Sequence, residues 1–193
     1  LNTEGETIIK AKKSRNHSEL LFKYLKLPIK VEKKKNYDLI KIKGKKKIPS
    51  LNYKIPSDIS SCAFFIVLTI LSENSKLKIR DVNINPSRIG ILHILKLMGV
   101  KIKKTNLKKY KGEYIADLDI KSTKKIKAVN CSSKLNSSAI DEFLLIFLLA
   151  AKAKGVSYFK NLSELNEKES PRLKWGSKIL KKMGIRNILT DKS

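Results

Sequence analysis

The chain has 193 residues and carries 43 lysine and arginine residues against 17 aspartate and glutamate residues, a net charge of +26. Its apolar content of 41% is enough to build a core, which excludes a wholly disordered chain. The longest apolar runs, 63–71 and 143–151, are too short to span a bilayer. Two cysteines, Cys62 and Cys131, are too few for a disulfide framework or a zinc site, so we expect a reducing, cytoplasmic setting.

The positive charge has two interpretations. Clustered cations are typical of proteins that bind nucleic acid, because they release counterions from the phosphate backbone. Here only five of the 43 basic residues are arginine, the side chain better suited to phosphate and base edges, and the lysines are scattered over every segment. We therefore expect a bias of composition rather than a nucleic-acid partner, and a basic field that favours small anionic substrates.

Three amphipathic segments along the chain share one ending. The segments 20–29, 91–100 and 176–185 have apolar residues at helical spacing, which predicts a helix in each. Each helix is expected to stop at a proline or glycine, namely Pro28, Gly99 or Gly184. Residues typical of strands follow each stop, and a strand-like run also occupies 186–189.

A second repeated feature precedes two of these segments. Paired serines at 60–61 and 137–138 open apolar runs at 63–68 and 140–151, and serine is a good helix N-cap. Both helices are apolar nearly all round, which predicts that both are buried.

Strands are expected at 77–84, 101–103, 114–121, 126–129 and 156–161, with solvated turns at 32–37 and 105–112. The unit is therefore helix, strand, amphipathic helix, strand, strand, and the class is α/β with an internal repeat.

Five short blocks in one order carry a resemblance to a known family. They are Ser14-Arg15-Asn16-His17-Ser18-Glu19, Ile55-Pro56-Ser57-Asp58-Ile59-Ser60-Ser61, Asn85-Pro86-Ser87-Arg88-Ile89-Gly90, Ala139-Ile140-Asp141-Glu142 and Glu167-Lys168-Glu169-Ser170-Pro171-Arg172-Leu173. With these blocks the chain resembles the EPSP synthase family over nearly its whole length.

The resemblance implies the enolpyruvyl transferase fold, an inside-out α/β barrel in which each of two domains has three βαβαββ units. Residues 1–193 would be the end of one such domain and most of a second, about half of the protein, with repeat boundaries near 50 and 125. We expect this piece alone to be inactive.

The resemblance also implies an activity, the transfer of the enolpyruvyl group of phosphoenolpyruvate to the 5-hydroxyl of shikimate 3-phosphate. That reaction needs a base for the hydroxyl proton and an acid for the methylene carbon, and two carboxylates in different environments can divide these roles. Asp141, expected in the first turn of a buried helix, is the candidate base, and Glu169 is the candidate proton donor. Without the resemblance, Asp141 would be interpreted as a helix-terminal carboxylate and Glu169 as part of a solvated charged loop.

Four further residues match substrate-binding positions of the family. Lys168 is expected to bind substrate and to assist proton transfer, and Arg172 to bind a carboxylate or phosphate of phosphoenolpyruvate. Ser14 and Arg15 match positions that contact shikimate 3-phosphate, although Arg15 could instead pair with Glu19 four residues later. We expect no metal and no cofactor, no membrane or nucleic-acid partner, and a monomer.

The roles of Asp58 and Arg88, which lie in these blocks, stay open at this point. Asp58 could line the cleft, Arg88 could be structural or functional, and helix capping is the preferred role of Ser60 and Ser61. Neither histidine is expected to bind a ligand.

Three residues depart from the family pattern. They are Ser57 in place of glycine, Asn16 in place of aspartate, and Pro171 in place of aspartate.

Two alternatives to this function remain. One is the sister transferase that acts on UDP-N-acetylglucosamine, and the other is a basic nucleic-acid-binding module.

Overall fold

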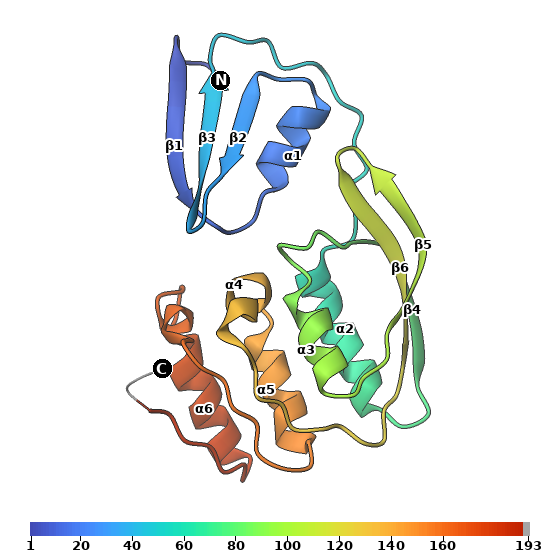
Figure 1. Ribbon diagram of the computed structural model, residues 1–193. Helices are drawn as coiled ribbons and strands as arrows, with labels where there is room; N and C mark the ends of the chain where they lie inside the picture. Colours follow the sequence, from blue (N-terminus) through green and yellow to red (C-terminus); the bar gives the residue numbers. More distant parts are fainter. Residues whose placement is uncertain (191–193) are drawn as a thin grey trace.

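The computed structural model describes residues 1–190, which form two parts joined by the segment 44–56 (Figure 1). The smaller part is the N-terminal sheet with one helix, and the larger part contains the remaining strands and a layer of helices. Among the described residues, no helix combines the length and apolar character needed to cross a membrane.

The N-terminal part is a strand–helix–hairpin unit. It consists of β1 (Glu6–Lys12), α1 (His17–Tyr24), β2 (Ile29–Lys33) and β3 (Tyr37–Lys43). The hairpin strand β3 lies between β1 and β2 and is antiparallel to both, so the sheet order is β1-β3-β2. The turn expected within 32–37 is present.

The second part repeats this topology. After α2 (Ile59–Leu71), the chain forms β4 (Lys76–Asn83), α3 (Gly90–Leu97), β5 (Lys103–Tyr110) and β6 (Glu113–Lys121). The sheet order is β4-β6-β5, again with antiparallel neighbours, as in the N-terminal part. The predicted α/β class and the predicted order of helix, strand, amphipathic helix, strand and strand are therefore confirmed for this unit.

The last section is mostly helical. It contains a 3-10 turn (Ser133–Leu135), α4 (Asn136–Ala139), α5 (Phe143–Lys152), a second 3-10 turn (Ser163–Asn166) and α6 (Arg172–Lys182).

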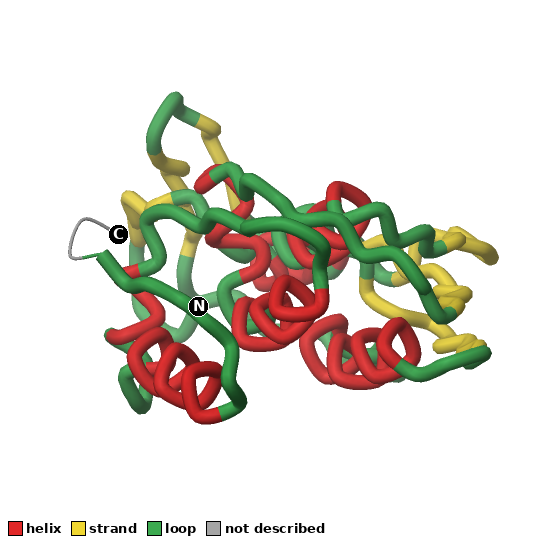
Figure 2. The backbone as a smooth tube through the Cα atoms, turned by 90° about the horizontal axis from the view of Figure 1, so that it is seen from below, coloured by secondary structure: helices red, strands yellow, loops and turns green. Residues whose placement is uncertain are grey.

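The core lies where α5 packs against both α2 and α3, with α2 also against β4 and β6 and with α6 outside α5. Seen from below, the strands lie toward the two sides of the view, and most of the helices lie between and below them (Figure 2). The largest fully buried side chains are Phe143, Ile59, Ile66, Ile70, Ile91, Ile94, Leu95, Met98, Leu118, Ile120, Ile146 and Leu149.

One expectation about the helices is wrong. The helix α2 is not buried all round, because Phe64, Phe65 and Leu68 are each at least 60% exposed. Its opposite face, with Ile59, Ala63, Ile66 and Ile70, is in the core. No part of residues 1–190 covers the exposed apolar stripe.

Several strand expectations also need correction. The segment 105–112 is not a turn, since most of it belongs to β5, whose polar side chains hide the strand pattern on both faces. The expected strands at 126–129 and 156–161 form only isolated bridges, Lys127 with Lys154 and Asn130 with Tyr158. Each bridge joins a single pair of residues, so no ladder extends, and residues 186–189 lie in no strand either.

Candidate active site

Asp141 lies in a turn between two helices and not in the first turn of a continuous helix, as the sequence had suggested. The helix α4 ends at Ala139 and α5 begins at Phe143, with Glu142 as its N-cap. The hydroxyl of Ser138 donates to the carbonyl of Leu135 at 3.0 Å, so it closes the preceding turn and does not cap α5. The carboxylate of Asp141 is therefore free to project from an interhelical corner.

Three cations from separate segments meet at that carboxylate. Arg15, in the loop between β1 and α1, donates to Oδ2 of Asp141. Nζ of Lys168 lies 3.5 Å from Oδ1, and Nη1 of Arg172, the first residue of α6, lies 3.4 Å from the same oxygen. The structure thus brings together three of the four predicted substrate-binding residues around the predicted base, and Arg15 pairs with Asp141 rather than with Glu19.

The charge state of Asp141 follows from these neighbours. Burial by itself raises the pKa of this carboxyl, but the hydrogen bond from Arg15 and the nearby charges of Lys168 and Arg88 outweigh it and hold the pKa below its usual range. Asp141 is therefore an ionised carboxylate at neutral pH.

Glu169 joins the same cluster from its solvent side. Its Oε2 accepts a hydrogen bond of 2.5 Å from Nη2 of Arg172, so this guanidinium bridges the two predicted catalytic carboxylates. The side chain is 79% exposed, and its own backbone N–H, followed by Arg172, lowers the pKa of Glu169. In this arrangement Glu169 is ionised, and a group that takes Arg172 away would raise its proton affinity.

Ser14 is the predicted site residue that the structure does not connect to the cluster. It is exposed in the loop before Arg15 and forms no side-chain hydrogen bond with the residues that the structure describes.

A second polar network, behind Asp141, was only partly visible in the sequence. Nη2 of Arg88 donates to Oδ1 of Asp58 at 2.7 Å and to Oγ of Ser60 at 2.6 Å. The hydroxyl of Ser60 in turn donates to the carboxyl of Glu142. Burial raises the pKa of Glu142, so this carboxyl holds its proton more tightly than an exposed glutamate. The adjacency of Glu142 to Asp141 was the one sequence signal for it.

The capping prediction for the two serines is also corrected. Asp58 is the N-cap of α2, and its carboxylate accepts hydrogen bonds from the backbone N–H of Ser61 at 3.1 Å and from its hydroxyl at 3.2 Å. Carboxylates are strong caps because they accept from the orphan amides of the first turn. Ser60, by contrast, links α2 to Glu142.

The structure accommodates each of the three residues that depart from the family pattern. Ser57 exchanges backbone hydrogen bonds with Asp81 and Asn83 on β4 without a left-handed conformation. Oδ1 of Asn16 accepts hydrogen bonds from Asn85 and Ser87, and a carboxylate oxygen of aspartate would also accept them. Pro171 is the N-cap of α6, where its missing N–H leaves no helical bond unmade, and its carbonyl accepts from Trp175.

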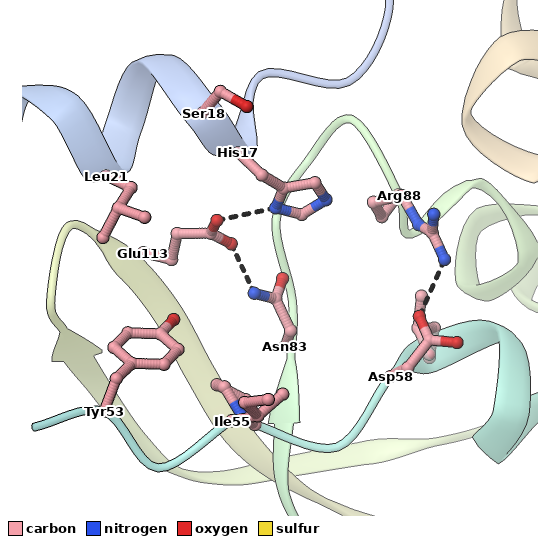
Figure 3. Close-up of a pocket in the computed structure, with 11 residues that line it drawn as sticks. His17, Ser18, Leu21, Tyr53, Ile55, Asp58, Asn83, Arg88 and Glu113 are labelled. Atoms are coloured by element: carbon pink, nitrogen blue, oxygen red, sulfur yellow. Dashed lines mark hydrogen bonds and ion pairs between the residues drawn. The ribbon is translucent and has the colours of Figure 1, made fainter.

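A pocket of about 320 Å³ lies beside this network, at the junction between the two parts of the chain (Figure 3). His17 and Glu113 line one side, and Arg88 and Asp58 line the other. His17, which the sequence did not suggest as a ligand-binding residue, pairs with Glu113. In residues 1–190 no three His, Cys, Asp or Glu side chains are grouped as a metal site would require.

The chemistry that this arrangement supports is that of an anion site next to carboxylates. Arg15, Lys168 and Arg172 outnumber Asp141 and Glu169, so the cluster retains positive charge for an anionic ligand. Two carboxylates within reach of the same arginine can accept and return protons.

Comparison with known proteins matches this picture. The model of the family described as EPSP synthase (3-phosphoshikimate 1-carboxyvinyltransferase) matches residues 1–191. The chain is 37% identical to the 3-phosphoshikimate 1-carboxyvinyltransferase of Petrotoga mobilis over 187 residues, which is 96% of this chain and 42% of that protein. It is also 37% identical to the protein of the same name from Ruthia magnifica, covering 99% of this chain and 43% of that one.

Solved structures give the same result. The EPSP synthase of Acinetobacter baumannii superposes with a TM-score of 0.87 at 34% identity, over 99% of this chain and 42% of that one. The enolpyruvyl transferase NikO of Streptomyces tendae shares the fold, with a TM-score of 0.59 at 16% identity over 79% of this chain and 35% of that one. The expected enolpyruvyl transferase fold is thereby confirmed. The chain spans about two fifths of the length of the curated relatives that it matches.

Proposed function

The chain belongs to the EPSP synthase family, and on that premise we propose that the protein containing it transfers the enolpyruvyl group of phosphoenolpyruvate to the 5-hydroxyl of shikimate 3-phosphate. The observation that carries the proposal is the convergence of Arg15, Lys168 and Arg172 on the carboxylate of Asp141. Two anionic substrates need several cations at one point, and the hydroxyl needs a carboxylate base beside them.

In the addition step, the 5-hydroxyl oxygen bonds to the central carbon of phosphoenolpyruvate and its proton passes to Asp141. The methylene carbon takes a proton from Glu169, which gives a tetrahedral adduct. In the elimination step, the bond from the central carbon to the phosphate oxygen breaks, the leaving phosphate takes the proton held by Asp141, and the new methyl group returns a proton to Glu169. The double bond is then restored in the product.

The charge states around the cluster support these roles. An anion bound by Arg15 would weaken the hydrogen bond that lowers the pKa of Asp141, which would make this carboxylate a better base. A substrate carboxylate or phosphate on Arg172 would likewise raise the proton affinity of Glu169. In both cases binding of the substrate would raise the proton affinity of the carboxyl that the reaction uses.

The remaining assignments belong to the same proposal. Lys168 would bind substrate and assist proton transfer, and Ser14, exposed beside Arg15, would contact shikimate 3-phosphate. We further propose a cytoplasmic monomer that uses no cofactor.

The deciding experiment is an assay of phosphate release from phosphoenolpyruvate by the complete protein that contains this chain. Shikimate 3-phosphate and UDP-N-acetylglucosamine are offered separately. Release with shikimate 3-phosphate alone is expected. Release with the UDP-sugar alone would assign the sister reaction, and release with neither from a folded protein would refute the proposal.

A further inference from the structure

The two residues that follow Arg15 tie its loop to the second part of the chain. Asn16 and His17 begin α1, and both form side-chain hydrogen bonds with residues more than 65 positions later. Resting on the proposed function, we propose that His17 and Glu113 are positioning residues, which hold Arg15 at the carboxylate of Asp141 across the junction and so set the affinity for the anionic substrate that Arg15 contacts.

The pairing of His17 with Glu113 is the centre of this junction. Nδ1 of His17 lies 2.6 Å from Oε1 of Glu113, and Nδ2 of Asn83 donates to the other carboxylate oxygen (Figure 3). Glu113 is 6% exposed, and a buried carboxylate requires hydrogen-bond donors. Because α1 supplies one of the two side-chain donors, moving α1 away would leave a buried oxygen of Glu113 without its partner.

Asn16 adds a second attachment to the loop between β4 and α3. Its Oδ1 accepts from Nδ2 of Asn85 at 2.9 Å and from Oγ of Ser87 at 3.4 Å. Asn85 is 2% exposed, and its own Oδ1 accepts from the backbone N–H of Ser87 at 2.9 Å. This loop is therefore internally bonded, and it leads directly to Arg88 behind the active site.

Backbone packing shows that the contact is close and not only a pair of flexible side chains. Gly112, in the turn between β5 and β6, has φ +95°, and a Cβ there would lie 2.8 Å from the carbonyl oxygen of Leu20 in α1. Both the left-handed conformation and the absence of a side chain are needed for α1 to rest on this turn. Glu113 is the next residue, so the turn delivers its carboxylate to His17.

These attachments determine where Arg15 can reach. The guanidinium is 41% exposed, and Asp141 is its ion-pair partner within the described residues. The backbone of Arg15 is fixed by the two anchored residues that follow it. Without them, the N-terminal part would be held by the segment 44–56 and by the packing of α1 on the turn at Gly112, and Arg15 would sample positions away from Asp141.

The test uses the complete protein with the variants His17→Ala, His17→Gln and Glu113→Gln, and His93→Ala as the control. Glutamine at position 17 retains a donor for Glu113, and His93 is exposed on α3 and forms no side-chain hydrogen bond within residues 1–190. The first readout is the Kd and KM for shikimate 3-phosphate together with kcat. The second is hydrogen exchange of the backbone amides of residues 14–18.

We expect His17→Ala to raise the Kd and KM for shikimate 3-phosphate about tenfold, with kcat within about threefold of wild type, because a hydrogen bond to a charged group is lost. His17→Gln should recover most of the affinity, and His93→Ala should match wild type. Combining His17→Ala with Glu113→Gln should weaken binding no more than the stronger single change, since both remove one interaction.

The outcomes separate this inference from the proposed function. If wild type binds no shikimate 3-phosphate, the proposed function fails, and hydrogen exchange decides the anchoring alone. Faster exchange at 14–18 in His17→Ala, restored in His17→Gln, supports the anchor. The inference is overturned if His17→Ala shows the same hydrogen exchange and the same affinity as wild type. It is also overturned if His17→Gln loses as much affinity as His17→Ala while its melting temperature is unchanged.

Discussion

Replacing Gly90 with alanine should loosen the helix contact on which Asp141 depends. Gly90 is the first residue of α3, and a Cβ there would lie 2.7 Å from the carbonyl carbon of Ser138 and 2.8 Å from Cβ of Ala139 in α4. Ordinary contact begins at 3.4 Å, so the two backbones must separate by about 0.7 Å. Overpacking of this kind costs about 1–3 kcal/mol, and alanine's better helix propensity offsets up to about 1 kcal/mol of it. We expect a net loss of about 1–2 kcal/mol.

Thermal unfolding and kinetics of the complete protein can measure both consequences. A loss of this size lowers Tm by about 2–8 °C for a domain of some 200 residues. Because Asp141 follows α4 directly, a shift approaching 1 Å should also reduce kcat/KM at least about tenfold. The matched control is Gly176→Ala, whose Cβ would clash only with the end of the flexible Leu144 side chain and make ordinary contact with Phe147, and it should not lower Tm. A Gly90→Ala protein with wild-type Tm and kinetics would refute the reasoning.

Three other changes test the core and the carboxylates. Phe143→Ala should cost about 3–5 kcal/mol of unfolding free energy by urea titration, because the ring is fully buried, and Phe143→Leu should cost clearly less. Burial raises the pKa of Glu142 above its ordinary 4.5, so its contribution to stability is present at acidic pH and falls as pH rises through the native value. Glu142→Gln should therefore gain stability relative to wild type with rising pH, and a constant difference between pH 4 and 8 would contradict this. Glu169→Gln should reduce kcat by more than about 100-fold with little change in binding of shikimate 3-phosphate, and wild-type turnover would remove Glu169 from the mechanism.

Periodicity and helix-stop residues were enough to predict much of the fold. The helices α3 and α6 lie where apolar spacing and the glycines at 99 and 184 put them, and β6 appears within one residue of its expected start. The strand β5 was missed because lysine, threonine and asparagine occupy both of its faces, so no alternation marks it. Its position is set by pairing with β6, which is a tertiary effect.

The cluster around the predicted base was predictable only through the family blocks. The contact of Arg15 with Asp141 joins residues 126 positions apart, and that of His17 with Glu113 joins residues 96 apart. Local sequence rules favoured nearer partners, such as Glu19 for Arg15, because helical spacing offers them directly. The long-range pairs form because folding places a carboxylate beside each of these side chains, the buried Glu113 beside His17 and the partly buried Asp141 beside Arg15.

Asp141 and Glu142 show how strongly tertiary structure controls the chemistry of similar neighbours. In one continuous helix, the two carboxyls would point only about 100° apart and would share much of one environment. The turn between α4 and α5 instead directs Asp141 to Arg15, Lys168 and Arg172, and Glu142 to the hydroxyl of Ser60 in the first turn of α2. The first carboxyl is consequently held ionised and the second is biased toward its protonated form. Because the raised pKa of Glu142 makes its ionisation less favourable, it lessens the negative charge next to the proton acceptor Asp141, and adjacent negative charge would oppose the binding of anionic substrates.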